Sequence, residues 1–338
     1  MNHQKTKKIV SDNLTNFIAN IYKIEIRDCF SRVQAGYSSD NFIIGSQDKK
    51  YFLKRYNKKC DQTRICDIHK TKEFFAANGI PIARPLITKK GESFFKFGGR
   101  FYALFPYLGQ KTNQKSSIEM IRSLAEMQAK MHQVGKPGRP KIHQRKLTTW
   151  NKNSAKDRGQ AILKIIENRQ RLDRFDKSAK EFVEFKIEQI NKNEITPQKV
   201  KLSFDHLVHG DFHGHNVFYD QSGRVKNVFD LEKTVYAPRA YELSRAIDYV
   251  CLSDFDIVKA GIYFGSYRKI YPISDEEFFR GFRFYFLKGI HTFWIEESHY
   301  FENDRRADEL YVGDIKRTRY FEKNLDRLLA KIIEQSKR

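Results

Sequence analysis

Two carboxylates and one carboxamide lie close together in the sequence, and their types suit phosphate chemistry. Asp211 follows a short apolar run, Asn216 comes five residues later, and Asp230 ends a second apolar run. The polar turn 220–223 between the runs predicts two short strands around a hairpin. Asn216 would begin one strand and Asp230 would end the other, so we expect their side chains to lie near each other. Carboxylate and amide oxygens are the ligands that Mg²⁺ takes.

Phosphoryl transfer needs few groups beyond these. It requires a metal that neutralises phosphate charge and a carboxylate that orients the attacking hydroxyl and accepts its proton. Asp211 precedes the two expected metal ligands, Asn216 and Asp230, so we expect Asp211 to be the catalytic base. A single Asp in a loop is commonly a turn residue. The combination His-Gly-Asp-x-x-x-x-Asn, with a second Asp after a hairpin, favours the catalytic interpretation.

Three histidines in the same stretch, His209, His213 and His215, raise the alternative of a zinc site. Zinc needs three or four converging ligands, and the sequence gives no sign of such a set. We expect His209 to be an internal residue that hydrogen-bonds the backbone of the loop. The four cysteines include no Cys-x-x-Cys pair, which is typical of free thiols in a reducing compartment.

The composition is that of a globular protein with a sizeable core. Of 338 residues, 40% are hydrophobic and 14% are aromatic. No apolar run is long enough for a membrane helix, and the basic start lacks the apolar segment of a signal peptide, so we expect a cytoplasmic protein. The net charge of +22 raises the possibility of nucleic-acid binding. Lysines and arginines are scattered over the whole length, however, and we expect neither a nucleic-acid nor a membrane partner.

Local patterns predict an α+β protein whose two parts differ. In the first hundred residues, apolar periodicity and polar turns predict an antiparallel sheet with one helix inserted after its third strand. After Gly109 the periodicity becomes mostly helical, interrupted by the hairpin described above. The expected helices are 11–22, 64–78, 116–131, most of 154–192 and the region from 242 onward, and the expected early strands are 24–34, 41–45, 50–56, 93–97 and 100–107.

The motifs at 209–216 and 230–232 resemble those of the aminoglycoside phosphotransferase and choline kinase superfamily of small-molecule kinases. The run Pro-Arg-Ala-Tyr-Glu-Leu at 238–243 also matches the superfamily pattern. The order of predicted elements fits over most of the chain, from about residue 10 to about residue 320. These motifs are specific for the superfamily rather than for one substrate.

The resemblance implies a bilobal, protein-kinase-like α+β fold. An N-terminal nucleotide-binding lobe, residues 1–107, would hold the antiparallel sheet and one helix. A larger, mostly helical lobe, residues 108–338, would carry catalysis and acceptor binding. ATP or GTP with Mg²⁺ would bind in the cleft, and a hydroxyl of a small molecule would accept the γ-phosphoryl group.

The resemblance also assigns roles to upstream residues. Lys54 occupies the strand position of the lysine that holds the α- and β-phosphates. The phosphate-covering loop would include Gly36, Ser38 and Ser39, whose backbone and hydroxyl groups would serve as donors. The inserted helix is expected to supply a glutamate that pairs with Lys54, and Glu73 is the only Glu available on it.

The segment Phe-Pro-Tyr-Leu-Gly at 105–109 matches the superfamily's hinge between lobes. The hinge backbone would hydrogen-bond the adenine ring. Because proline has no N–H, the carbonyl of Phe105 and the N–H of Tyr107 are the expected contacts.

The motifs leave the acceptor open. Residues 274–314 are acidic and rich in aromatics within a basic protein, and such walls favour a cationic acceptor, for example an aminoglycoside or a choline-like amine. Aromatics at helical spacing are also typical of a core, so a neutral sugar or homoserine is the alternative acceptor. A nucleotide-binding regulatory module without turnover is the alternative from another class. Such a module would lack one of the catalytic residues, and none is missing.

Overall fold

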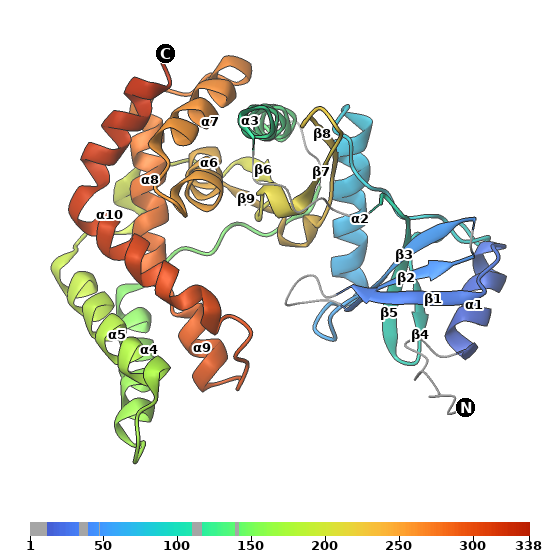
Figure 1. The fold of residues 1–338 in the computed structure, drawn as a ribbon, viewed down its shortest axis with the longest axis horizontal. Helices are drawn as coiled ribbons and strands as arrows, with labels where there is room; N and C mark the ends of the chain where they lie inside the picture. The colour runs from blue at the N-terminus through green and yellow to red at the C-terminus, as the bar shows by residue number, and fades with distance from the viewer. Residues whose placement is uncertain (1–11, 34–39, 47, 110–116, 139–141) are drawn as a thin grey trace, which may run out of the picture. The chain divides into compact units, whose positions relative to one another are not determined.

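The computed structural model describes residues 12–33, 40–46, 48–109, 117–138 and 142–338. The chain divides into two compact units, whose elements are labelled in Figure 1. The first unit comprises residues 1–115 with 226–232, and the second comprises 116–225 with 233–338. The expected lobes divide the chain at one point, after residue 107, whereas the structure groups the short segment around Asp230 with the N-terminal residues.

A five-stranded antiparallel sheet dominates the first unit. Its strand order is β1-β2-β3-β5-β4, and one helix, α2, is inserted after β3. This is the arrangement that the alternating sequence pattern predicts. The elements are α1 (Asp12–Tyr22), β1 (Asp28–Val33), β2 (Asp40–Gly45), β3 (Lys50–Arg55), α2 (Gln62–Ala77), β4 (Phe95–Phe97) and β5 (Arg100–Pro106).

Two apolar clusters hold the first unit together. One joins α1 to the sheet through Leu14, Ile18 and Leu53. The other joins α2 to β5 through Ile65 and Phe105. Figure 1 shows α2 running beside the sheet. Burial of these large side chains supplies most of the stability of such a unit.

The segment that carries Asp230 is tied to the first unit by backbone bonds. Val228 N donates to Pro81 O at 2.7 Å, and Ala83 N donates to Val228 O at 3.2 Å. These bonds form a short parallel bridge just after α2. They fix the backbone at Val228 and thereby the position of Asp230, which follows two residues later.

The second unit is mostly helical, as the sequence predicts. None of the helices in the described part of the chain is long and apolar enough to cross a membrane. The helices are α3 (Ile118–Val134), α4 (Lys152–Glu167), α5 (Arg174–Lys192), α6 (Arg239–Ile247), α7 (Ile257–Ile270), α8 (Asp275–Ile290), α9 (Trp294–Tyr300) and α10 (Asp308–Gln335). The short strands are β6 (His206–Val208), β7 (Val217–Tyr219), β8 (Val225–Val228, which continues into the first unit) and β9 (Val235–Ala237).

Two parts of the second unit have separate roles. Helices α4, α5 and α9, seen together in green and orange in Figure 1, share an apolar core with α10 that includes Phe182 and Tyr311. Strand β6 pairs antiparallel with β9, with Val208 opposite Val235. The loop that follows β6 carries Asp211, and α6 begins two residues after β9. The β6–β9 pair therefore positions the loop and α6 together.

Candidate active site

The loop after β6 makes a turn that only glycine allows. Gly210 has φ +83°, and a Cβ atom there would lie 1.9 Å from the backbone oxygen of Lys233. Both the left-handed backbone and the close approach exclude a side chain. The glycine of the His-Gly-Asp motif thus lets the loop pass directly against the segment around Lys233.

A buried carboxylate on α6 anchors this loop. Glu242 accepts a hydrogen bond from Gly210 N and another from His132 Nε2 at 2.8 Å. The other ring nitrogen of His132 lies 2.7 Å from the hydroxyl of Tyr267. Burial acts to raise the pKa of Glu242, but His132 and the Gly210 N–H outweigh burial and lower it. The loop is therefore held by a charged group inside the second unit.

Asp211, the expected catalytic base, is surrounded by cationic and hydrogen-bonding groups. Arg245 Nη2 donates to its Oδ1, Lys233 Nζ donates to its Oδ2 at 2.8 Å, and His213 Nε2 lies 3.5 Å from Oδ1. Burial acts to raise the pKa of Asp211. The hydrogen bond from His213 and the charges of Arg245 and Lys233 outweigh it, so the pKa lies well below the ordinary value. Asp211 is thus held as a carboxylate.

The backbone of the loop fixes the orientation of Asn216. Its Nδ2 donates to Asp211 O at 2.8 Å, so its amide oxygen is the end turned away from that bond. Asp211 N donates to His209 Nδ1 at 3.2 Å, and His209 is fully buried. The prediction that His209 is an internal residue bonded to the loop backbone is confirmed.

In the first unit, Lys54 meets two carboxylates. Its Nζ lies 3.1 Å from Asp230 Oδ1 and pairs more closely with Glu232. Burial acts to lower the pKa of Lys54, but the charges of Asp230 and Glu232 raise it above the ordinary value. Asp230 itself has φ +63°, in the left-handed region that Asp adopts more readily than most non-glycine residues.

The expected pairing of Lys54 with Glu73 is wrong in the structure. Glu73 is half-exposed, and its carboxylate lies 3.5 Å from Arg84 Nη1. The physical reason is helix geometry. Lys72, not Glu73, is on the buried face of α2, and successive residues of a helix point about 100° apart.

The remaining predicted nucleotide contacts involve Phe105, Tyr107 and the loop of Gly36, Ser38 and Ser39. Phe105 is buried in β5 opposite Phe52, and Tyr107 follows directly after that strand and is partly exposed. Their backbone contacts to adenine stay predictions. Gly36, Ser38 and Ser39 lie outside the described residues.

The sequence analysis did not identify three residues of these two clusters, namely Glu232, Lys233 and Arg245. Glu232, the second partner of Lys54, was visible as the last residue of the Asp-Leu-Glu motif. Lys233 follows it directly. Arg245 lies one helical turn beyond Glu242 on α6, and no local pattern marks it, because its role depends on the return of α6 beside the loop.

The acidic and aromatic stretch 274–314 mainly serves the second unit's own structure. Glu277 accepts two hydrogen bonds of 2.8 Å from Arg239, and Glu296 pairs with the buried Lys186 at 3.1 Å. Phe278 and Phe282 are fully buried. The composition that suggested a cationic acceptor therefore has an internal explanation at these positions.

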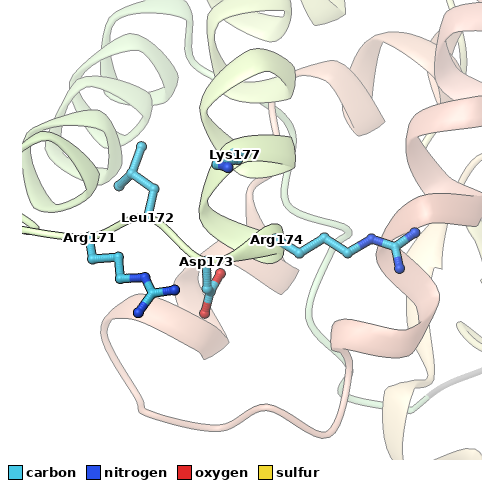
Figure 2. Close-up of a pocket in the computed structure, with 5 residues that line it drawn as sticks. All are labelled: Arg171, Leu172, Asp173, Arg174 and Lys177. Carbon is cyan, nitrogen blue, oxygen red and sulfur yellow. The ribbon is translucent and has the colours of Figure 1, made fainter.

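One surface hollow of about 490 Å³ lies at the start of α5 (Figure 2). It is lined by one short stretch of chain, 171–177. Asp173 in this stretch caps α5 by accepting from Asp176 N. None of the predicted site residues lines the hollow.

Comparison with known proteins assigns the family. The sequence profile of the phosphotransferase enzyme family matches residues 30–272, so the chain belongs to that family. A homoserine kinase of Afipia carboxidovorans is 20% identical over 272 residues, which cover 80% of this chain and 78% of that protein. An aminoglycoside phosphotransferase structure from Alicyclobacillus acidocaldarius matches with a TM-score of 0.65 at 14% identity, covering 99% of this chain and 98% of that chain. A spectinomycin phosphotransferase in complex with ADP and spectinomycin matches with a TM-score of 0.61 at 14% identity, covering 98% of both chains.

These comparisons confirm three predictions. The resemblance to the superfamily holds, and the fold is the α+β, protein-kinase-like class. The enzyme class is also confirmed, because the family consists of phosphotransferases: the protein is a kinase of small molecules whose acceptor group is a hydroxyl.

Proposed function

We propose that this protein transfers the γ-phosphoryl group of ATP to a hydroxyl group of a small cytoplasmic amino alcohol. The observation that carries the proposal is the Asp211 cluster. A carboxylate held in its charged form by Arg245 and Lys233 is suited to accept a hydrogen bond from a hydroxyl and orient it, and to take its proton as the bond to phosphorus forms. Asp211 is therefore our candidate for the catalytic base.

The nucleotide would be held by residues from both parts of the sequence. Lys54 would bind its phosphates, Asn216 and Asp230 would hold Mg²⁺, and the backbone of Phe105 and Tyr107 would contact adenine. Gly36, Ser38 and Ser39 would contribute donors to the phosphates, as the family resemblance implies. The donor set fits Mg²⁺, because it consists of hard oxygens and the amide oxygen of Asn216 is the end left after its nitrogen bonds Asp211 O. The metal would neutralise charge on the phosphates.

The acceptor class rests on what the relatives share. Homoserine, the substrate named for the curated relative, is a hydroxyl compound that carries an amino group. Spectinomycin, named for a structural neighbour, also carries amino groups. We therefore favour an amine-bearing alcohol over a neutral sugar. Homoserine is the first compound to test, because the relatives that bear its name match most of this chain.

The test is phosphorylation of a panel of hydroxyl compounds by the full chain with Mg·ATP, read by mass spectrometry. The panel spans homoserine, choline, ethanolamine, aminoglycosides and simple sugars. We expect one amine-bearing compound to gain a phosphoryl group. Asp211→Asn should bind the nucleotide but lose at least about 10²-fold in turnover.

Two results would contradict the proposal. Equal loss of nucleotide binding and turnover in Asp211→Asn would assign Asp211 to structure. Binding of Mg·ATP without turnover of any panel member would favour the alternative of a nucleotide-binding regulatory module. Exchange of ATP for GTP in the same assay determines which nucleotide is the donor.

A further inference from the structure

The buried face of α2 contains a lysine. Ile65, Ile68 and Phe75 occupy this face with exposures of 1% or less, at the spacing of an amphipathic helix. Lys72 lies on the same stripe and is only 5% exposed. A buried ammonium group is costly unless an anion or a polar partner compensates for it. Its retention at this position therefore needs a reason.

The neighbouring buried histidine has an internal explanation, and Lys72 does not. His69 lies 2.8 Å from the hydroxyl of Tyr56 and 2.7 Å from the hydroxyl of Ser93, so both ring nitrogens are bonded. Burial, with the charges of Lys72 and Lys54, lowers the pKa of His69 to about 3 and keeps the ring neutral. His69 is thus a structural strut.

Lys72 has an aromatic neighbour but no carboxylate at ion-pair distance among the described residues. Its Nζ lies 5.1 Å from the ring centre of Phe105, a cation–π contact. Burial and the charge of Lys54 lower the pKa of Lys72 to about 8, against the attraction of Asp230 and Glu232. Both of these carboxylates pair with Lys54 instead. Lys72 is a second ammonium group in the Lys54 cluster.

Lys72 lies near residues that are expected to bind the base and the phosphates of a nucleotide. Its ammonium group lies over the ring of Phe105, the residue whose backbone carbonyl is expected to contact adenine. Lys54, which acts on it electrostatically, is the expected phosphate-binding residue. An anion with several charges would offset the cost of burying two neighbouring ammonium groups, and a polyphosphate chain is such an anion.

We propose that Lys72 is a second polyphosphate-binding residue, which binds the phosphates of the nucleotide together with Lys54. This inference rests on the proposed function, because it takes the first unit to be the nucleotide-binding part. It adds a cationic contact from α2, the helix on which the family resemblance led us to expect an acidic one. Lys72 would therefore discriminate nucleotides by their phosphates and not by their base.

The test compares ligands that differ only in phosphates. Binding of the non-hydrolysable analogue AMP-PNP with Mg²⁺, of ADP and of adenosine is measured by calorimetry for the full chain. We expect Lys72→Met to weaken AMP-PNP binding by about tenfold to a hundredfold and ADP binding by less, with adenosine binding unchanged. Lys72→Arg should retain most of the affinity. Lys70→Met is the matched control, because Lys70 is exposed on the same helix.

A second measurement uses the wild-type protein and does not depend on the folding of a variant. The side-chain resonances of Lys72 next to its ammonium group are followed by NMR while AMP-PNP or adenosine is added. AMP-PNP should shift these resonances, and adenosine should not. Equal shifts with both ligands, or equal loss of adenosine and AMP-PNP affinity in Lys72→Met, would assign Lys72 to structure.

The outcomes separate this inference from the proposed function. A wild-type protein that binds no nucleotide contradicts the proposed function itself. A wild-type protein that binds AMP-PNP and phosphorylates an acceptor, with Lys72→Met unchanged in both, contradicts only the role of Lys72.

Discussion

The Lys54 cluster of the first unit and the Asp211 cluster of the second are opposite in charge. In the first, the ammonium group of Lys54 lies between the carboxylates of Asp230 and Glu232. In the second, one carboxylate lies between the cations of Lys233 and Arg245. The side chains of Lys54 and Asp211 are equally buried, each 13% exposed. Each cluster fixes the charge of its central residue.

The two clusters differ in whether the residues around the central side chain have a second expected role. Asp230 is both a partner of Lys54 and an expected metal ligand, so binding of Mg·ATP would have to exchange this ion pair for new ones. Neither Arg245 nor Lys233 has a second assigned role, so Asp211 keeps its charge whether or not a nucleotide is bound. We infer that the first cluster is built to be rearranged by its ligand and the second to stay as it is.

The first prediction, with the largest expected effect, removes the buried cation of the second cluster. Arg245 is 20% exposed and binds Asp211 Oδ1. Arg245→Met leaves a largely buried carboxylate with only Lys233 and His213, so we expect a loss of about 3 kcal/mol in the free energy of unfolding. Urea denaturation measures this change.

Arg245→Lys is the control for the fork geometry of the guanidinium group. It keeps the charge but offers a single ammonium group, so we expect it to recover part of the stability. A stability loss below about 0.5 kcal/mol in Arg245→Met would mean that Lys233 and His213 alone hold the charge of Asp211.

The second prediction removes the ammonium group of Lys54, the central residue of the first cluster. Lys54→Met should raise the KM for Mg·ATP by about tenfold to a hundredfold, because a charge-assisted contact to the phosphates is lost. Steady-state kinetics at saturating acceptor measures it. Lys59→Met, at an exposed site, should have no effect. An unchanged KM would contradict the idea that Lys54 exchanges Asp230 for phosphate.

The sequence predicted the parts of the two clusters that lie in continuous motifs. Asp211, Asn216 and Asp230 stand at fixed spacings around a hairpin, so their residue types and order carry the signal. Lys54 was assigned through the family resemblance, because it occupies the strand position of the family's phosphate-binding lysine. Local periodicity also predicted the antiparallel sheet and the helical second part.

The sequence did not predict the contacts that depend on three-dimensional packing. The partner of Lys54 comes from 176 residues further along the chain, and only the folded structure brings Asp230 beside it. The prediction of Glu73 was wrong because the sequence places a glutamate on the helix but does not determine which face of the helix packs against the sheet. A shift of one residue along α2 moves a side chain from the buried stripe, where Lys72 lies, to solvent.

A third prediction concerns the exposed partner of Asp211. The side chain of Lys233 is 61% exposed, so solvent screens its ion pair with Asp211 Oδ2. We expect Lys233→Met to lower kcat less than about fivefold, which corresponds to about 1 kcal/mol or less. A larger loss of kcat with unchanged stability would indicate that Lys233 contacts the transferred phosphoryl group.

The smallest expected effect is a flat pH dependence above the ordinary pKa of Asp, about 3.9. The folded pKa of Asp211 is depressed, so its charge contributes stability above the ordinary pKa, and this contribution is lost as the pH falls toward the lower folded value. The difference in free energy of unfolding between the wild type and Asp211→Asn should therefore be constant from about pH 8 to about pH 5 and shrink at lower pH. Urea midpoints across this range measure the difference. A change that sets in above about pH 5 would instead point to protonation of His213, whose pKa is lowered by burial and which lies 3.5 Å from the same carboxylate.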